Sequence, residues 1–330
     1  MSSIWLRIGS YPATEIAAHT PPTWETWADG GSGSCSWAFS LTMRSQHQAL
    51  QTGAVVEVMC GPMPVWSGIL SEPDRTTWEC TAYGLASAAR QYLALDGVGN
   101  NTRDMGTAIT TAQAAGWQGL NSVSVSGPVA GDATGNPISA GQLLDEYAEQ
   151  TGQRWGVDGQ RQLYMTPGPS GPMWLASPDA SAFGSTDEDR AGTLKGRYLD
   201  SGTNLYATAT SGSGAPQVAV DLSERGKMTL TAAQSILAGM LTRDHAQRAW
   251  TNGVTLTRDQ IQTLGGSPAA LIDVRAGQMM RSFGLAYTGG SALHLDTVIG
   301  KTRYTAGDDT IYVEPVNTAP RSFVDVIAAS

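Results

Sequence analysis

The sequence predicts an α+β protein in which antiparallel β structure predominates. Apolar and polar residues alternate along many short segments, which is typical of half-buried strands, whereas few segments have helical spacing. The 39 glycines and 16 prolines among 330 residues supply the many turns that short strands need. A chain of this length exceeds what one hydrophobic core usually serves, so we expect more than one domain.

The first 95 residues predict a small antiparallel barrel or sandwich. Strands are expected at residues 36–43, 53–60, 64–70 and 77–83. Along the first of them, Trp37 and Phe39 share one face and small polar residues the other. A helix over 84–95 is expected to close the outer end. The Gly- and Ser-rich segment 30–34 is interpreted as a flexible loop.

The middle of the chain predicts helices and a hairpin. One helix is expected over 104–115, and a second begins at the N-cap candidate Ser139 and ends near Gly152. Strands at 154–157 and 160–165 flank Asp158-Gly159, a pair that favours a tight type I′ turn. The composition of residues 166–172 is that of a linker.

The second half predicts one clear helix among many strands. Thr231 and Gln234 are spaced as a capping box at the start of that helix. Gly53 and Gly277 each precede an apolar strand, which weakly indicates an internal duplication. Strands are expected at residues 192–199, 204–210, 217–221, 249–256, 270–274, 278–285, 294–299, 310–313 and 323–327.

Charge and cysteine content exclude several functions. A net charge of −9 disfavours general binding to nucleic acid, which depends on basic patches. Cys35, Cys60 and Cys80 form an odd set without C-x-x-C spacing, so we expect reduced, buried thiols. The four histidines are not paired at helical spacing, and neither a metal nor a cofactor is expected. The N-terminus lacks the pattern of a signal peptide, and no segment is long and apolar enough to span a membrane, so synthesis in a cytoplasm is expected.

No complete catalytic motif occurs, and no catalytic residue is assigned. The pairs Asp187/Asp189 and Asp308/Asp309 suit carboxylate catalysis or calcium binding, but solvated loop charges explain them better. His294 and Asp296 share a strand face, where the histidine can hydrogen-bond its neighbour.

Aromatic residues leave a binding function open. Trp24 and Trp27, expected in a loop, could stack on sugars, although packing within an assembly explains them equally well.

A set of short motifs, in order, resembles one family of phage proteins. The first half carries Val65–Pro73, Tyr83–Leu85 and Tyr92–Asp96 after the strand at 53–60. The second half carries Val220–Leu222, Gly226–Thr229, Ala233–Gln234, Gly265–Ala269 and Val274–Met279. In this order the chain resembles, over nearly its whole length, minor tail proteins of long-tailed phages of actinobacteria. That family is similar to the hub protein of contractile-tail baseplates.

The resemblance implies a structural role rather than an enzymatic one. It implies two barrel-like domains joined by α/β connecting subdomains, and a homotrimer whose six barrels match the hexameric tail tube or distal tail protein. The tape measure protein and downstream tip or fibre proteins are implied as further partners, and genomic DNA passes through the lumen without specific binding. An acidic wall would repel its phosphates. The location implied is the tail tip of the virion.

These expectations divide the chain and name candidate contacts. The expected domains are a barrel at 1–95, a connecting subdomain at 96–172, a β segment of the second barrel at 173–228, and a helix with C-terminal strands at 229–330. Two alternatives stay open: a receptor- or carbohydrate-binding tail protein, and a cell-wall hydrolase. Candidate interface residues are Trp66, Arg275 and Arg281, with the loops Gly97–Thr102 and Ser181–Arg190, and Trp66 is equally a candidate for the core.

Overall fold

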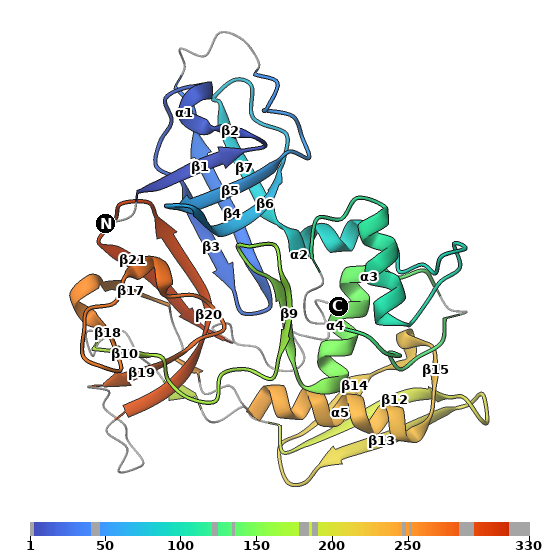
Figure 1. Cartoon of the computed structure of the whole chain (residues 1–330). Helices are drawn as coiled ribbons and strands as arrows, with labels where there is room; N and C mark the ends of the chain where they lie inside the picture. The colour runs from blue at the N-terminus through green and yellow to red at the C-terminus, as the bar shows by residue number, and fades with distance from the viewer. Residues whose placement is uncertain are drawn as a thin grey trace.

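The fold consists of two β modules and two α/β modules (Figure 1). The computed structural model describes residues 3–40, 47–120, 125–133, 136–177, 185–186, 191–245, 249–250, 253–283 and 294–316. Within these ranges most of the strand pairs are antiparallel, and five helices of the α type lie among them. The expected α+β class, with two barrel-like β parts joined by α/β subdomains, is confirmed.

The N-terminal β module is a sheet that surrounds its own core. Its elements are β1 (Ile4–Ile8), β2 (Tyr11–Pro12), α1 (Ala13–Ile16), β3 (Thr23–Trp27), β4 (Gly30–Ala38), β5 (Val55–Cys60), β6 (Met63–Leu70) and β7 (Glu79–Gly84). The strand order is β3-β4-β7-β6-β5-β1-β2. Leu6, Val58 and Trp66 are buried in its core. The expected strands at 53–60, 64–70 and 77–83 are confirmed.

The expected loop at 30–34 is wrong, because these residues begin β4. Their glycines permit close packing between backbones. A Cβ on Gly31 would lie 2.2 Å from the carbonyl oxygen of Val157, and one on Gly84 would lie 1.6 Å from that of Ser32. The absence of side chains here therefore reflects crowding, not flexibility.

The first α/β module, called the helical module below, contains α2 (Leu85–Ala88), α3 (Met105–Ala114), α4 (Ala140–Thr151), β8 (Arg154–Val157) and β9 (Leu163–Thr166). The helix expected over 84–95 is shorter than predicted: α2 is followed only by a 3₁₀ turn, Ala89–Gln91. Leu85 and Ala89 pack into the core of the helical module with α3 and α4 rather than closing a barrel end.

The two helices expected here, over 104–115 and from Ser139 to near Gly152, are confirmed as α3 and α4. Capping residues fix their ends. Asp104 caps α3 by accepting a hydrogen bond from the Thr107 amide. Ser139 and Gln142 form a capping box on α4, and Gly152 ends that helix at φ 66°.

Acid should weaken the cap of α3. Hydrogen bonds from Thr107 hold the pKa of Asp104 below its usual range, so its contribution is present above the unfolded pKa and is lost as pH falls through the folded pKa. We expect Asp104→Asn to flatten the fall of stability below about pH 4, since Asn caps without titrating. Urea unfolding between pH 2 and 6 measures this. An unchanged pH slope would contradict it.

The β8–β9 hairpin is confirmed, but its expected type I′ turn is wrong. The connection spans residues 158–162, and Arg161 takes the positive φ of 64°. The Asp158 side chain accepts hydrogen bonds from the amides of Gln160 and Gln162. Gly159 lies instead against the backbone of Val65, which a Cβ would approach to 2.3 Å. Tertiary contact thus decides where the glycine is needed.

The α5 module is a four-stranded sheet covered by one helix (Figure 1). It contains β12 (Thr193–Asp200), β13 (Tyr206–Gly212), β14 (Gln217–Asp221), β15 (Lys227–Met228) and α5 (Leu230–His245). Leu194, Ala209, Val220 and Leu237 lie in its core. The expected cap at Thr231 is two residues late, because the Thr229 hydroxyl accepts from the Ala232 amide.

The C-terminal β module contains β10 (Trp174–Ala176), β17 (Val254–Thr257), β18 (Ile261–Thr263), β19 (Met279–Phe283), β20 (His294–Thr305) and β21 (Thr310–Pro315). A small separate sheet pairs β11 (Ser185–Thr186) with β16 (Ala249–Trp250). The strand expected at 270–274 is wrong, because Leu271–Asp273 forms a 3₁₀ turn. The strand expected at 323–327 lies outside the described residues.

The sequence predicts that the whole segment 173–228 belongs to the second barrel, but only part of it does. Only β10 joins the C-terminal β module, whereas β12–β15 form the sheet of the α5 module. Small residues alternate in this segment as they do in a barrel strand. Which strands pair with one another depends on packing against α5, and the local sequence pattern does not specify that packing.

Four strands of each β module follow the same topology. In the first, β5, β6 and β7 form an antiparallel meander, and the earlier strand β4 pairs antiparallel with β7. In the second, β19, β20 and β21 form the meander, and the earlier strand β17 pairs antiparallel with β21. Gly53 and Gly277 precede equivalent strands with φ of 91° and 86°, and each amide donates to the middle meander strand. The expected duplication therefore has a structural counterpart.

Candidate functional site: the junctions between modules

The two β modules are joined by the pairing of β3 with β20. Thr26 lies opposite Thr302 and Thr23 opposite Thr305. Their hydroxyl oxygens are 2.7 and 2.9 Å apart, respectively. Thr26 Oγ1 also accepts a hydrogen bond of 2.9 Å from the Ala276 amide. One continuous sheet thus fixes the two modules relative to each other.

Side chains around this pairing add charge and aromatic contacts. Lys301 Nζ lies 2.8 Å from Glu25 Oε1, and both side chains are largely buried. Glu25 also accepts from the Ser34 hydroxyl at 3.0 Å. Trp24 packs edge to face on Tyr304 with ring centroids 5.1 Å apart. This combination resists both sliding and rotation of the sheet.

Thr26→Val should loosen the junction of the β modules. The substitution keeps the shape but leaves the Ala276 amide and the Thr302 hydroxyl without their partner in a buried site, which costs about 2 kcal/mol. Urea unfolding followed by circular dichroism measures the loss. Thr302→Val is the matched variant, and the double variant should cost less than the sum of the two. Strict additivity would contradict a direct Thr26–Thr302 interaction.

A cavity of about 770 Å³ opens where these modules meet. Its apolar wall includes Ile4, Pro22, Cys60, Leu271 and Ile272. His19, Arg258, Tyr304 and three aspartates, Asp273, Asp308 and Asp309, also line it. The aspartates are exposed. Asp308 and Asp309 are solvated loop charges, as the sequence predicts, and the fold places Asp273 beside the same recess.

Tyr304 is held neutral at the edge of this cavity. Burial raises the pKa of its phenol, and the negative charge of Asp308 raises it further. Its hydroxyl donates to the Asp308 carbonyl oxygen at 3.1 Å. A neutral tyrosine that is used in this way supports the loop rather than acting as a base.

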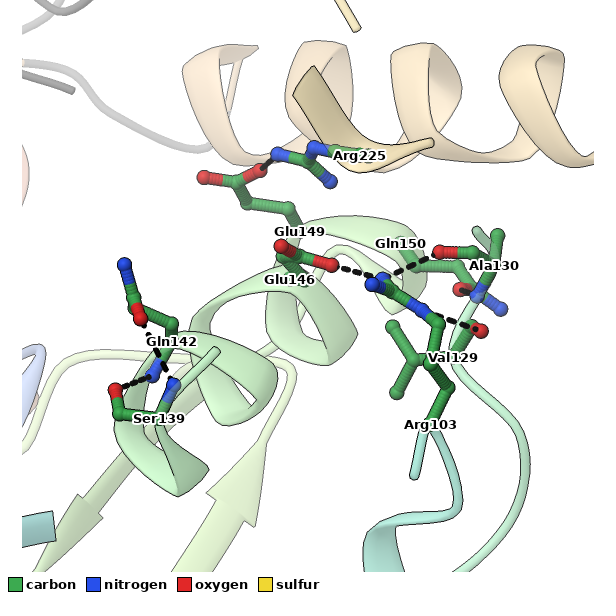
Figure 2. A network of polar contacts seen from close by, with 9 residues as sticks. All are labelled: Arg103, Val129, Ala130, Ser139, Gln142, Glu146, Glu149, Gln150 and Arg225. Carbon is green, nitrogen blue, oxygen red and sulfur yellow. Dashed lines mark hydrogen bonds and ion pairs between the residues drawn. The ribbon is translucent and has the colours of Figure 1, made fainter. Parts of the chain in front are cut away.

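The two α/β modules are joined by α4 and α5 (Figure 2). Arg103 pairs with Glu146 and also donates to the carbonyl oxygens of Val129 and Ala130. The Gln150 side chain accepts from the Ala130 amide at 2.8 Å. Arg225 pairs with Glu149 across the junction, and both side chains are mostly buried. Glu146 and Glu149 on α4 therefore each pair with one arginine, Arg103 of the helical module and Arg225 of the α5 module.

Several predicted contact residues are not available as contacts. Trp66 is fully buried in the N-terminal core, so its proposed interface role is wrong. Trp24 is 4% exposed in β3, and neither it nor Trp27 lies in the expected loop. A Cβ on Gly33 would lie 2.7 Å from Trp27 Nε1, because the indole packs against that glycine. A sugar-stacking platform from this pair is therefore not present.

The remaining predicted residues are placed on the surface or outside the described part. Arg281 binds Asp296 in a two-pronged ion pair of 2.6 and 2.7 Å. The side chain of His294, the partner expected for Asp296, lies outside the described part. Arg275 is partly buried. In the loop Gly97–Thr102 the first four residues are exposed, and Val98 at its tip is 83% exposed. Asp187, Asp189 and most of Ser181–Arg190 lie outside the described residues.

The thiols suit structural roles. Cys35 and Cys80 are buried. Burial raises the pKa of both thiols, that of Cys80 to about 12. Cys60 is only half-buried, because it borders the cavity, so the expectation of three buried thiols is wrong for this one.

Within the described ranges no cluster of three or more metal-ligating side chains occurs. No described helix is both long and apolar enough to cross a membrane.

Comparison with known proteins identifies the fold. No protein-family model matches the chain, and no curated protein matches it. Its structure is similar to a tail protein from Neisseria meningitidis MC58, with a TM-score of 0.60, 13% identity and 95% of each chain covered. It is also similar to the 43 kDa tail protein of prophage MuSo2 from Shewanella oneidensis, with a TM-score of 0.59, 14% identity, and 94% of this chain and 97% of that chain covered.

A third likeness extends over the full length. Prophage tail protein gp18 from Listeria monocytogenes EGD-e gives a TM-score of 0.56 and 12% identity over 99% of this chain and 98% of that one. The chain thus has the fold of solved phage tail proteins. All four modules take part in the likeness, since each comparison covers nearly the whole chain.

Proposed function

We propose that the chain is a structural, non-enzymatic component of a bacteriophage tail, of the baseplate-hub type. The observation that carries this proposal is the repeated topology of the two β modules, seen within a fold that phage tail proteins share. Three copies with two similar modules each provide six similar surfaces. A trimeric ring of this kind adapts the sixfold tail tube to threefold tip proteins.

The rigid junctions support this role. An adaptor must hold its modules at fixed angles while it carries load. Here the β3–β20 sheet holds the two β modules together, and the α4–α5 contact holds the two α/β modules together. The ring surrounds the channel for genomic DNA, and the net charge of −9 per chain keeps the DNA from adhering. Its neighbours are the tail tube or distal tail protein, the tape measure protein and the tip or fibre proteins. We place it at the tail tip of a long-tailed phage of actinobacteria.

Symmetry tests the proposal. The purified chain should elute as a trimer by light-scattering chromatography, and images of the particle at its level should show six similar lobes with threefold symmetry. A monomer at every concentration and in the particle would contradict the proposal. Clearing of host peptidoglycan by the pure chain, or its specific binding to host glycan, would favour the enzymatic or receptor-binding alternatives instead.

A further inference from the structure

The sheet of the α5 module ends in two open edges. In the described part of the chain, β13 and β14 each pair only with β12, at opposite sides. The helix α5 covers one face of this sheet (Figure 1). Both edge strands therefore present backbone N–H and C=O groups that no described strand of the same copy satisfies.

Hydrogen bonds within the sheet show which groups point outward. The Arg197 carbonyl oxygen accepts from the Leu222 amide, and the Thr193 amide donates to Pro216, so these residues direct their backbone groups toward β14. Their partners in β13 then form the non-hydrogen-bonded pairs. The outward residues of β13 are accordingly Tyr206, Thr208 and Thr210, and those of β14 are Gln217, Ala219 and Asp221.

The β13 edge lacks the usual protection against strand pairing. Such edges usually carry proline, charge or a bulge, whereas β13 has neither proline nor charge and keeps an unbroken register with β12 over its length. No charged residue occurs between residues 201 and 220, in a chain of net charge −9. Leu205 and Tyr206 at its start are 68% and 61% exposed. Copies that repel each other elsewhere can approach here.

We propose that β13 of one copy pairs antiparallel with β14 of the next copy, so that the sheet continues between subunits. The two strands run in opposite directions within one sheet, since β13 is antiparallel and β14 parallel to β12. The contact is therefore head to tail, and a second copy supplies the missing edge. This inference rests on the trimer proposed above, whose three copies close such a contact into a ring.

Thr208→Pro tests the pairing. Proline removes an amide that points out of the sheet, a position that edge strands tolerate, and it blocks an incoming strand. We expect the Thr208→Pro chain to associate at least about tenfold more weakly, as for the loss of one or two hydrogen bonds, with an unchanged circular dichroism spectrum. Thr208→Val keeps the amide and the branched side chain, and should remain trimeric. Thr210→Pro should behave as Thr208→Pro does.

Hydrogen exchange of the unmodified chain gives a second measurement that does not depend on how the variants fold. The amides of Thr208 and Thr210 should exchange about 100-fold more slowly in the trimer than in the diluted monomer. A trimer that survives both proline substitutions, or whose Thr208 amide exchanges fast, would overturn the edge pairing and leave the trimer itself standing. A chain that is monomeric throughout would overturn both, and a dimer joined by two β13 strands would overturn the head-to-tail arrangement.

Discussion

Trp66→Ala is expected to destabilise the chain by about 4 kcal/mol. The side chain is fully buried in the N-terminal β module, on β6 opposite Val58 of β5. Removing it leaves a large cavity between strands that are already hydrogen-bonded on both sides and therefore cannot collapse. Urea unfolding followed by far-ultraviolet circular dichroism measures the loss, and the unfolding midpoint should move to a lower urea concentration.

Two controls separate packing from polarity and from surface effects. Trp66 Nε1 has no hydrogen-bond partner among the described residues, so Trp66→Phe gives up only ring volume and should cost about 1 kcal/mol. Tyr83 is 51% exposed, and Tyr83→Ala should stay within about 0.5 kcal/mol of the parent. If Trp66→Ala lost no more than Tyr83→Ala, the tryptophan would not be a core residue, and its assignment as an interface residue would return.

Signals confined to a few neighbouring residues were sufficient for much of the fold. Ser139 and Gln142 set the start of α4, and Gly152 sets its end, because each acts on backbone groups within one turn. Alternation located β5 and β6 for the same reason. The class and the presence of two β modules could be predicted from such patterns with the help of the family resemblance.

Contacts between distant segments could not be predicted. The pairing of Thr26 with Thr302 spans almost the whole chain, and no local pattern specifies which strands become neighbours or in which register. The glycines at 30–34 resemble a flexible loop in sequence, whereas in the structure Gly31 lies against Val157 and Gly33 lies against the Trp27 indole. Close backbone contact and flexibility both select glycine, so the sequence does not distinguish them.

The positions of the residues at the candidate site could not be predicted from the sequence for the same reason. Trp24 and Trp66 suggested contacts because tryptophan suits both cores and interfaces, and only their neighbours decide between the two. The cavity draws its wall from segments near residues 4, 22, 60 and 271. Asp308 and Asp309 are adjacent in the sequence, but their place at its rim depends on the junction of the β modules.

Gly239→Ala is expected to destabilise the chain by about 2 to 3 kcal/mol, although alanine is the better helix former. A Cβ at position 239 of α5 would lie 1.8 Å from the carbonyl oxygen of Glu149 and 2.9 Å from the amide nitrogen of Gly152. Both are backbone atoms, so relief requires α4 and α5 to move apart. That movement also weakens the ion pair between Glu149 and Arg225.

The sign of the effect makes this test decisive. Gly106 lies in α3, where the nearest atom to a new Cβ is 3.5 Å away, so Gly106→Ala should leave stability unchanged or raise it by up to about 1 kcal/mol. Gly239→Ala should instead lower the urea midpoint and speed hydrogen exchange in β12–β14, because their sheet is held to α4 through α5. If Gly239→Ala matched Gly106→Ala, α4 and α5 would not be in backbone contact, and the rigid junction that a load-bearing adaptor needs would be lost.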